Sequence, residues 1–403
     1  MFTSERLRQE WRCEGISEQD LSAYAAALNI VEEHLGQGWI DSYIDEAHVI
    51  DAEGDDGQIC RQVSAKSGRA LLSLRILSRL GALLSATDKV LRFPRIRNKL
   101  KTGAEFSAAW SELLAAESLL LAGFQVEFAP SIEVNGRRRE ADLAVIVGGN
   151  RVIAEVFRPS SSKWQQEASE VMQRIFASDS PSRQLPRGHQ LSIALRRVPT
   201  PDEEAELMAR IGCRINLARN GIIAPPEEVG ECDPSGPEAF AHICLSDRVD
   251  QQFPAASNQF LRGRGLILLM ATTTISISPI ELPPLWLMIG IPFQDTRGED
   301  KLKEEMEQLP DGQASLLIID ISESPGVAHA WKPAVHQFMI NGHSLEQSTP
   351  LKPSAIWFMG ETITPDGPVP LTAPVVYENP NAPQLPPELR DFLRKQGKRN
   401  PST

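Results

Sequence analysis

The segment READLAVIVGGNRVIAEVFRP (Arg139–Pro159) decides the fold of this chain. Runs of apolar residues lie on both sides of GGN (Gly148–Asn150), and such a glycine-rich turn is typical of a β-hairpin. The pattern predicts one strand over Ala141–Val147 and a second over Arg151–Phe157. Pro159 and the serines after it end the second strand, because proline cannot donate a hydrogen bond to a sheet.

Two acidic residues lie in this apolar hairpin. Asp142 is at the start of the first strand and Glu155 is inside the second. Their positions are symmetrical about Gly149 to within one residue, so strand pairing through the turn brings them together. Two nearby carboxylates repel each other unless a cation lies between them, and hard oxygen ligands suit Mg²⁺ or Mn²⁺. Each acid alone also has a simpler explanation, Glu155 as an exposed edge-strand acid and Asp142 as a turn cap.

The segments around the hairpin have clear periodicities. The composition before it predicts a helix that ends at Gly123, then a short strand and a loop. The residues after it predict a second helix and a fourth strand. These elements are expected over Ala104–Leu121, Phe124–Phe128, the loop SIEVNGRRR (131–139), Lys163–Phe176 and Gln190–Leu195. Glu112, on the first of these helices, is a candidate third oxygen ligand for a cation.

Three short motifs in this order resemble the PD-(D/E)XK nuclease superfamily. They are Glu112 in WSELLAAESLLLAGF, Asp142 in READLAV and Glu155 in VIAEVFRP. The resemblance runs from Glu105 to Arg197 and implies a restriction-endonuclease-like core. It also implies that the three carboxylates are catalytic and bind one or two divalent ions, Mg²⁺ or Mn²⁺, which activate a water for phosphodiester hydrolysis.

The sequence departs from this pattern at two positions. Ala141 precedes the aspartate where the family has proline, and Phe157 stands where the family has a catalytic lysine. Arg158 and Lys163 are the candidates to supply the missing charge. Two classes of function therefore remain open. One is a metal-dependent nuclease, and the other is a catalytically inactive nuclease-fold protein that binds nucleic acid or assembles with a partner.

Basic residues gather near the candidate site, although the whole chain has a net charge of -12. Lys89–Lys101 holds six basic residues and no acidic one, and a second cluster follows in the loop after Phe128. The bland interpretation is two solvated surfaces, and the functional one is contact with the phosphates of nucleic acid, DNA in preference to RNA. The candidate nucleic-acid-binding residues are Arg92, Arg95, Arg97, Lys99, Lys101, Arg137, Arg138 and Arg139.

The expected fold class is α/β (α+β), with a central mixed β-sheet flanked by helices. Residues 1–100 are expected to form a helical N-terminal extension, with helices over Glu18–Leu35 and Ser67–Leu84 that are candidates for binding a second copy or a protein partner. Residues 101–200 form the nuclease-like core, 201–390 a mixed, strand-rich C-terminal region that could complete the same sheet, and 391–403 a disordered tail. In the C-terminal region a helix is predicted over Glu299–Leu309, and strands over Leu285–Phe293, Ser315–Ile321, Ser354–Gly360 and Ala373–Tyr377.

The cysteines and the hydropathy pattern bear on the compartment. The five cysteines are scattered and never form a CxxC pair, which is typical of reduced thiols in the cytoplasm. No apolar stretch reaches the roughly 20 residues of a membrane helix. We therefore expect a cytoplasmic protein without a membrane partner.

Overall fold

A computed structural model of the chain divides it into two compact units. Unit 1 comprises Met1–Ser160 with Arg297–Thr403, and unit 2 comprises Ser161–Thr296. Each combines helices with a mixed β-sheet, so the predicted α/β class is confirmed. The structure describes residues 18–42, 68–160, 163–176, 180–186, 188–230, 239–248, 254–261, 266–273, 285–292, 297–322, 327–339, 352–364, 367–370 and 375–396. The predicted disordered residues 397–403 lie outside this set.

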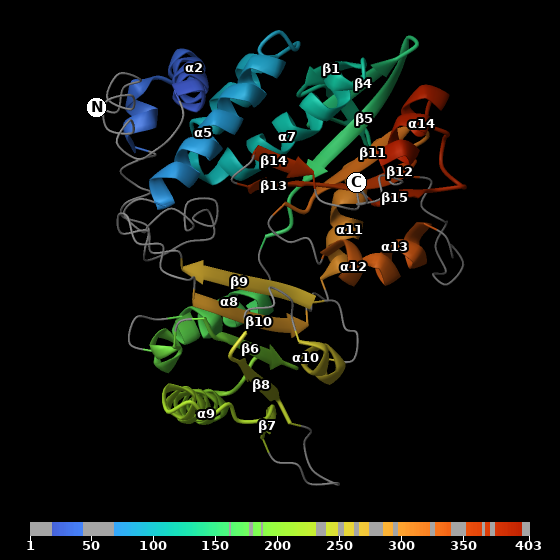
Figure 1. Ribbon diagram of the computed structural model, residues 1–403. Helices are drawn as coiled ribbons and strands as arrows, with labels where there is room; N and C mark the ends of the chain where they lie inside the picture. The colour runs from blue at the N-terminus through green and yellow to red at the C-terminus, as the bar shows by residue number, and fades with distance from the viewer. Residues whose placement is uncertain are drawn as a thin grey trace. The chain divides into compact units, whose positions relative to one another are not determined.

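Unit 1 is built on a six-stranded sheet (Figure 1). Its strand order is β1-β4-β5-β11-β12-β15. The strands β5, β11 and β12 run parallel, and the other pairs are antiparallel. The part of the predicted C-terminal region that follows Arg297 thus joins the sheet that the hairpin begins, whereas residues 201–296 belong to unit 2. The strands are β1 (Gln125–Phe128), β4 (Leu143–Val147), β5 (Asn150–Phe157), β11 (Ser315–Asp320), β12 (Ala355–Met359) and β15 (Val375–Glu378).

The central hairpin has the predicted register. Val147 pairs with Asn150 across the turn, and the ladder continues to Leu143 opposite Ala154. Gly148 and Gly149 have φ values of 55° and 82°, as a type I′ turn requires. One further step along the same register places Asp142 opposite Glu155.

The predicted loop over residues 131–139 is in fact a second hairpin. It consists of β2 (Ser131–Val134) and β3 (Arg137–Glu140), which pair with each other. Asn135 and Gly136 between them have φ values of 53° and 72°. Asn-Gly is the commonest two-residue hairpin turn because both residues accept positive φ. The loop prediction was therefore wrong, although Asn135 and Gly136 are a hairpin signal in the sequence.

One face of the sheet packs against five helices in a single hydrophobic core. The N-terminal helices are part of this core rather than an appendage, since Leu28, Val31 and Leu80 lie in it beside residues of the sheet. The last helix continues past residue 391, where the tail was predicted to start, because Leu393 is buried in the same core. The helices are α2 (Glu18–Leu35), α5 (Gly68–Thr87), α6 (Phe93–Leu100), α7 (Gly103–Leu121) and α14 (Pro387–Gln396).

The other face of the sheet meets α11 (Gly298–Glu307), α12 (Val327–Ala330) and α13 (Lys332–Met339). Side chains alternate between the faces of a strand. Val152, Ala154 and Val156 point into the helix-covered core, so the residues between them on β5 point to the α11–α13 side. A separate hairpin, β13 (Glu361–Thr364) with β14 (Gly367–Pro370), follows β12.

Unit 2 contains the helix and the strand that were predicted to close the nuclease-like core. Its five-stranded sheet has the order β7-β8-β6-β10-β9 and its own hydrophobic core. The observed division therefore differs from the predicted segment 101–200, because β5 pairs with β11 whereas β6 pairs with β8 and β10. Its elements are α8 (Lys163–Phe176), η3 (Pro181–Gln184), β6 (Gln190–Leu195), α9 (Pro201–Arg219), β7 (Glu227–Val229), β8 (Ala241–Ser246), α10 (Ala255–Phe260), β9 (Leu266–Thr273) and β10 (Leu285–Pro292).

Among the described helices of both units, none combines the length and the apolar character needed to cross a membrane.

Candidate functional site

At the end of the central hairpin, Asp142 interacts with two buried glutamates, Glu155 on β5 and Glu112 on α7. The hairpin register places Asp142 opposite Glu155, and the Asp142 Oδ2 atom accepts a hydrogen bond from the backbone N–H of Val156 at 2.9 Å. Glu155 is only 3% exposed, and so is Glu112, which α7 contributes. Asp142 is the accessible member, with a side chain 24% exposed. The three acids singled out in the sequence therefore lie in one cluster.

Each buried carboxylate of this cluster has its own cation. The Lys99 Nζ atom on α6 lies 2.7 Å from Glu112 Oε1 and 3.6 Å from Asp142 Oδ1. The Arg139 Nη2 atom on β3 lies 2.8 Å from Glu155 Oε1 and also donates to Gln308 Oε1 at 2.9 Å. Two basic residues that the sequence analysis proposes for phosphate contact, Lys99 and Arg139, thus pair with these acids.

The acids of this cluster repel one another despite these cations. Burial, and next the charge of Asp142, raises the pKa of Glu112 to about 8 and the pKa of Glu155 to about 9. Burial and the neighbouring acids, Asp142 among them, raise the pKa of Glu305 on α11 to about 7. Burial opposes the charge of Lys99, but Glu112 and Asp142 outweigh it and raise the pKa of its ammonium group. Glu112 and Glu155 therefore keep their protons at neutral pH, and a bound cation would have to displace those protons.

The chemistry of these donors fits a hard divalent cation, but the present side-chain arrangement does not enclose one. Carboxylate oxygens suit Mg²⁺ and Mn²⁺. In the part of the chain that the structure describes, no three acidic, histidine or cysteine side chains form a group that could hold a metal ion as they stand. The amine of Lys99 lies between Glu112 and Asp142, so binding at these two carboxylates would require that amine to shift.

Phe157 occupies the position where the nuclease resemblance would place a lysine. It follows Glu155 by two residues on β5 and points to the same side of the sheet. Its ring stacks on Trp331, with ring centroids 6.1 Å apart and an interplanar angle of 14°. The aromatic ring therefore belongs to the packing between β5 and the helices that cover this side.

The two residues expected to replace that lysine lie elsewhere. The Arg158 Nη2 atom lies 2.6 Å from Asp320 Oδ2, in an ion pair whose side chains are 7% and 0% exposed. Lys163 lies on α8 of unit 2, is 90% exposed and pairs with Glu167 at 3.6 Å. The amine that does reach the carboxylates is Lys99. Local sequence pattern does not indicate this role, because Lys99 is on α6, 56 positions before Glu155 on β5.

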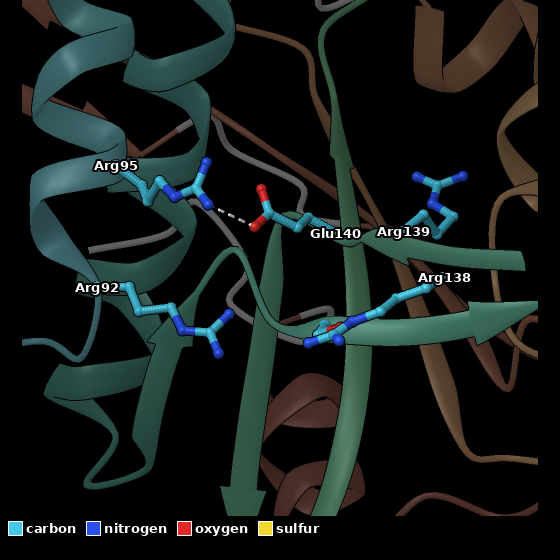
Figure 2. A pocket seen from close by; sticks show the side chains of 6 residues that line it. Arg92, Arg95, Arg138, Arg139 and Glu140 are labelled. Carbon is cyan, nitrogen blue, oxygen red and sulfur yellow. Dashed lines mark hydrogen bonds and ion pairs between the residues drawn. The ribbon is translucent and has the colours of Figure 1, made fainter.

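An open hollow of about 570 Å³ lies next to this cluster, between α6 and the second hairpin (Figure 2). Figure 2 shows the guanidinium groups of Arg92 and Arg95 facing Arg138, and that of Arg139 directed away from them. Arg95 pairs with Glu140 at 2.8 Å. Of the other basic residues expected to bind nucleic acid, Arg97, Lys101 and Arg137 do not line the hollow. Its lining residues are Arg92, Arg95, Ser131, Arg138, Arg139 and Glu140.

Comparisons with known proteins assign no function to this site. No protein-family model, curated protein or solved structure matches the chain.

Proposed function

We propose that this protein hydrolyses phosphodiester bonds of nucleic acid with the help of Mg²⁺ or Mn²⁺, in the manner of the PD-(D/E)XK nucleases that its motifs resemble. The observation that supports this most is the position of Asp142 opposite Glu155, with Glu112 beside them. Paired carboxylates at such a place are costly to keep unless they bind a cation or a substrate. The predicted cytoplasmic location and the preference for DNA over RNA belong to the same proposal.

In this proposal the three carboxylates hold the metal, and Asp142, the most exposed, meets it first. The bound ion would supply Lewis acidity and an activated water for attack on phosphorus. Lys99 takes the part that Phe157 cannot take, because its ammonium group already contacts the carboxylates. When a metal ion displaces this ammonium group from between Glu112 and Asp142, its positive charge can orient the attacking water and stabilise negative charge that develops on the phosphate.

A second candidate function is supported by Phe157 and by the internal cations. The ring stacked on Trp331 fills the position of the family's lysine, while Lys99 and Arg139 satisfy the buried acids without any metal. Under this alternative the chain is an inactive nuclease fold that binds nucleic acid or assembles with a partner. A partner that binds through the N-terminal helices would have to use surfaces other than their core-facing residues.

A cleavage assay separates the two candidates. The wild type is incubated with single- and double-stranded DNA and RNA in Mg²⁺, Mn²⁺ or chelator. We expect metal-dependent cleavage that Asp142→Asn abolishes. Lys99→Met should lower the rate roughly 10²- to 10⁴-fold, the usual contribution of a group that positions or activates a nucleophile.

Lys395→Met is the matched control, since Lys395 is exposed on α14 and lines no part of the hollow. This variant should cleave like the wild type. If the wild type is inert with every substrate and metal while it still binds nucleic acid, the binding function replaces the catalytic one.

A further inference from the structure

The hollow beside the carboxylates concentrates positive charge. Arg92, Arg95 and Arg138 direct their guanidinium groups into it from two elements (Figure 2), and Glu140 is the one acid among its lining residues. The side chain of Arg95 is 62% exposed and that of Arg92 is 39% exposed. Like charges that converge on an open space are favourable when an anion fills it. Planar guanidinium groups match the oxygens of phosphate in particular.

The backbone around the hollow is strained, which is a second and independent sign of a site. Arg92 has a φ of 65° and Ala129 a φ of 47°, conformations that residues with a side chain rarely adopt. Arg92 precedes the first turn of α6 and donates a hydrogen bond to the carbonyl of Ala129. Strained backbone of this kind clusters at binding sites. Here it holds an arginine at the positive end of a helix.

The helix α6 links the hollow to the carboxylate cluster. Arg95 and Lys99 are four residues apart on α6, so they lie along one face of the helix, and Arg92 stands immediately before its first turn. Arg95 pairs with Glu140 at the hollow, and Lys99 contacts Glu112 and Asp142. Four residues of α-helix rise about 6 Å, a separation comparable to that between adjacent phosphates of a nucleic-acid strand.

We propose that the hollow binds one phosphate group of the substrate, the one next along the strand from the phosphodiester presented to Asp142 and Glu155. This inference rests on the proposed function for the identity of the strand. It adds that α6 fixes the spacing of two consecutive phosphates, with Arg92 and Arg95 at one and Lys99 at the other. A ligand with a single phosphate therefore lacks half of the binding determinants.

The test compares ligands that differ by one phosphate, by NMR titration of the full chain in chelator and at fixed low ionic strength. The ligands are TpT, TpTpT and pTpT. Because charge-assisted hydrogen bonds contribute strongly, we expect the second phosphate to tighten binding to the wild type roughly tenfold. The larger increase in affinity over TpT, for TpTpT or for pTpT, shows whether the hollow prefers an internal or a terminal phosphate.

Arg138→Gln should remove most of this gain, because Arg138 lines the hollow and its Nε atom donates to the hydroxyl of Ser131, which carries no charge. Lys395→Gln removes one positive charge from an exposed position on α14, outside the lining, so it is the matched control and should keep the gain. Equal binding of all three ligands by the wild type would overturn the inference, as would a full gain in Arg138→Gln. The titration is done without metal, so it does not depend on cleavage. An increase in affinity that requires Arg138 would support the phosphate site even if the protein cleaves no substrate, and the two proposals can therefore fail independently.

Discussion

Replacing Arg158 by alanine should destabilise unit 1 rather than impair a catalytic step. The Arg158 Nη2 and Nε atoms lie 2.6 and 3.0 Å from Asp320 Oδ2, and the two side chains are 7% and 0% exposed. Ser111 Oγ donates to the same oxygen at 2.6 Å, and the Ser322 N–H donates to Oδ1 at 2.9 Å. These neutral donors remain in Arg158→Ala, but no cation in this contact set does. Leaving one partner of a buried ion pair uncompensated costs about 3–5 kcal/mol.

The pH dependence of this loss gives a second signature. In the wild type, burial opposes ionisation of Asp320, but Arg158 and the serine donors prevail and hold its pKa below the ordinary value. A depressed folded-state pKa contributes stability that is present at neutral pH and is lost as the pH falls through that pKa. Without Arg158, burial raises the pKa of Asp320, so the variant gains stability as the pH falls. The difference between variant and wild type should therefore be largest at neutral pH and shrink toward about pH 4.

Native-state hydrogen exchange of the β11 amides measures this effect in unit 1, whatever unit 2 does. The double variant Arg158→Met with Asp320→Leu should recover part of the lost stability, since a well-packed apolar pair can replace a buried ion pair. Lys163→Ala is the control, because an exposed side chain contributes little. A loss below about 1 kcal/mol in Arg158→Ala, unchanged with pH, would refute this account and return Arg158 to the candidates for the chemistry.

Two further predictions concern stability. In chelator, the free energy of unfolding of the wild type should fall as the pH rises from about 4.5 toward about 9, because Glu155 keeps its proton to a higher pH in the folded state than in the unfolded state. Urea unfolding of Glu155→Gln should show a flatter dependence on pH. An unchanged dependence would contradict the placement of Glu155 against Asp142. Gly81→Ala should cost about 1–3 kcal/mol in the same assay, since a Cβ there would lie 2.6 Å from the carbonyl oxygen of Ala27. Gly103→Ala, with open space around it, should be neutral or slightly stabilising, and similar effects at both glycines would speak against the close crossing of α2 and α5.

The part of the site that the sequence predicted is the part encoded locally. The turn at Gly148 and Gly149 fixes the register of β4 against β5, so the pairing of Asp142 with Glu155 follows from their spacing alone. Glu112 followed from a helix of strong propensity immediately before the strands. The same local logic applied to Asn135 and Gly136, where the hairpin was missed although its turn residues were present.

The part that the sequence did not reveal depends on contacts between distant segments. The partner of β5 is β11, with Leu317 opposite Glu155, and no periodicity indicates which of several apolar strands pair. The buried aspartate at the end of β11 then attracts Arg158, which removes that residue from the group expected near Glu155. The stacking of Phe157 on Trp331 likewise joins two segments that are separate in the sequence.

Under the proposed function, Lys99 supplies the positive charge that the family places on β5. A lysine at position 157 would share a strand face with Glu155, whereas Lys99 approaches Glu112 and Asp142 from α6. The position on β5 is then available to an aromatic ring that packs on Trp331. The same helix carries Arg95 to the hollow, with Arg92 immediately before its first turn, so one short helix of eight residues can both anchor a phosphate and present an amine to the acids. Under these proposals, the basic segment Lys89–Lys101 supplies, through Lys99, the positive charge that the motif lacks at Phe157. The catalytic and binding proposals therefore both depend on the position of α6.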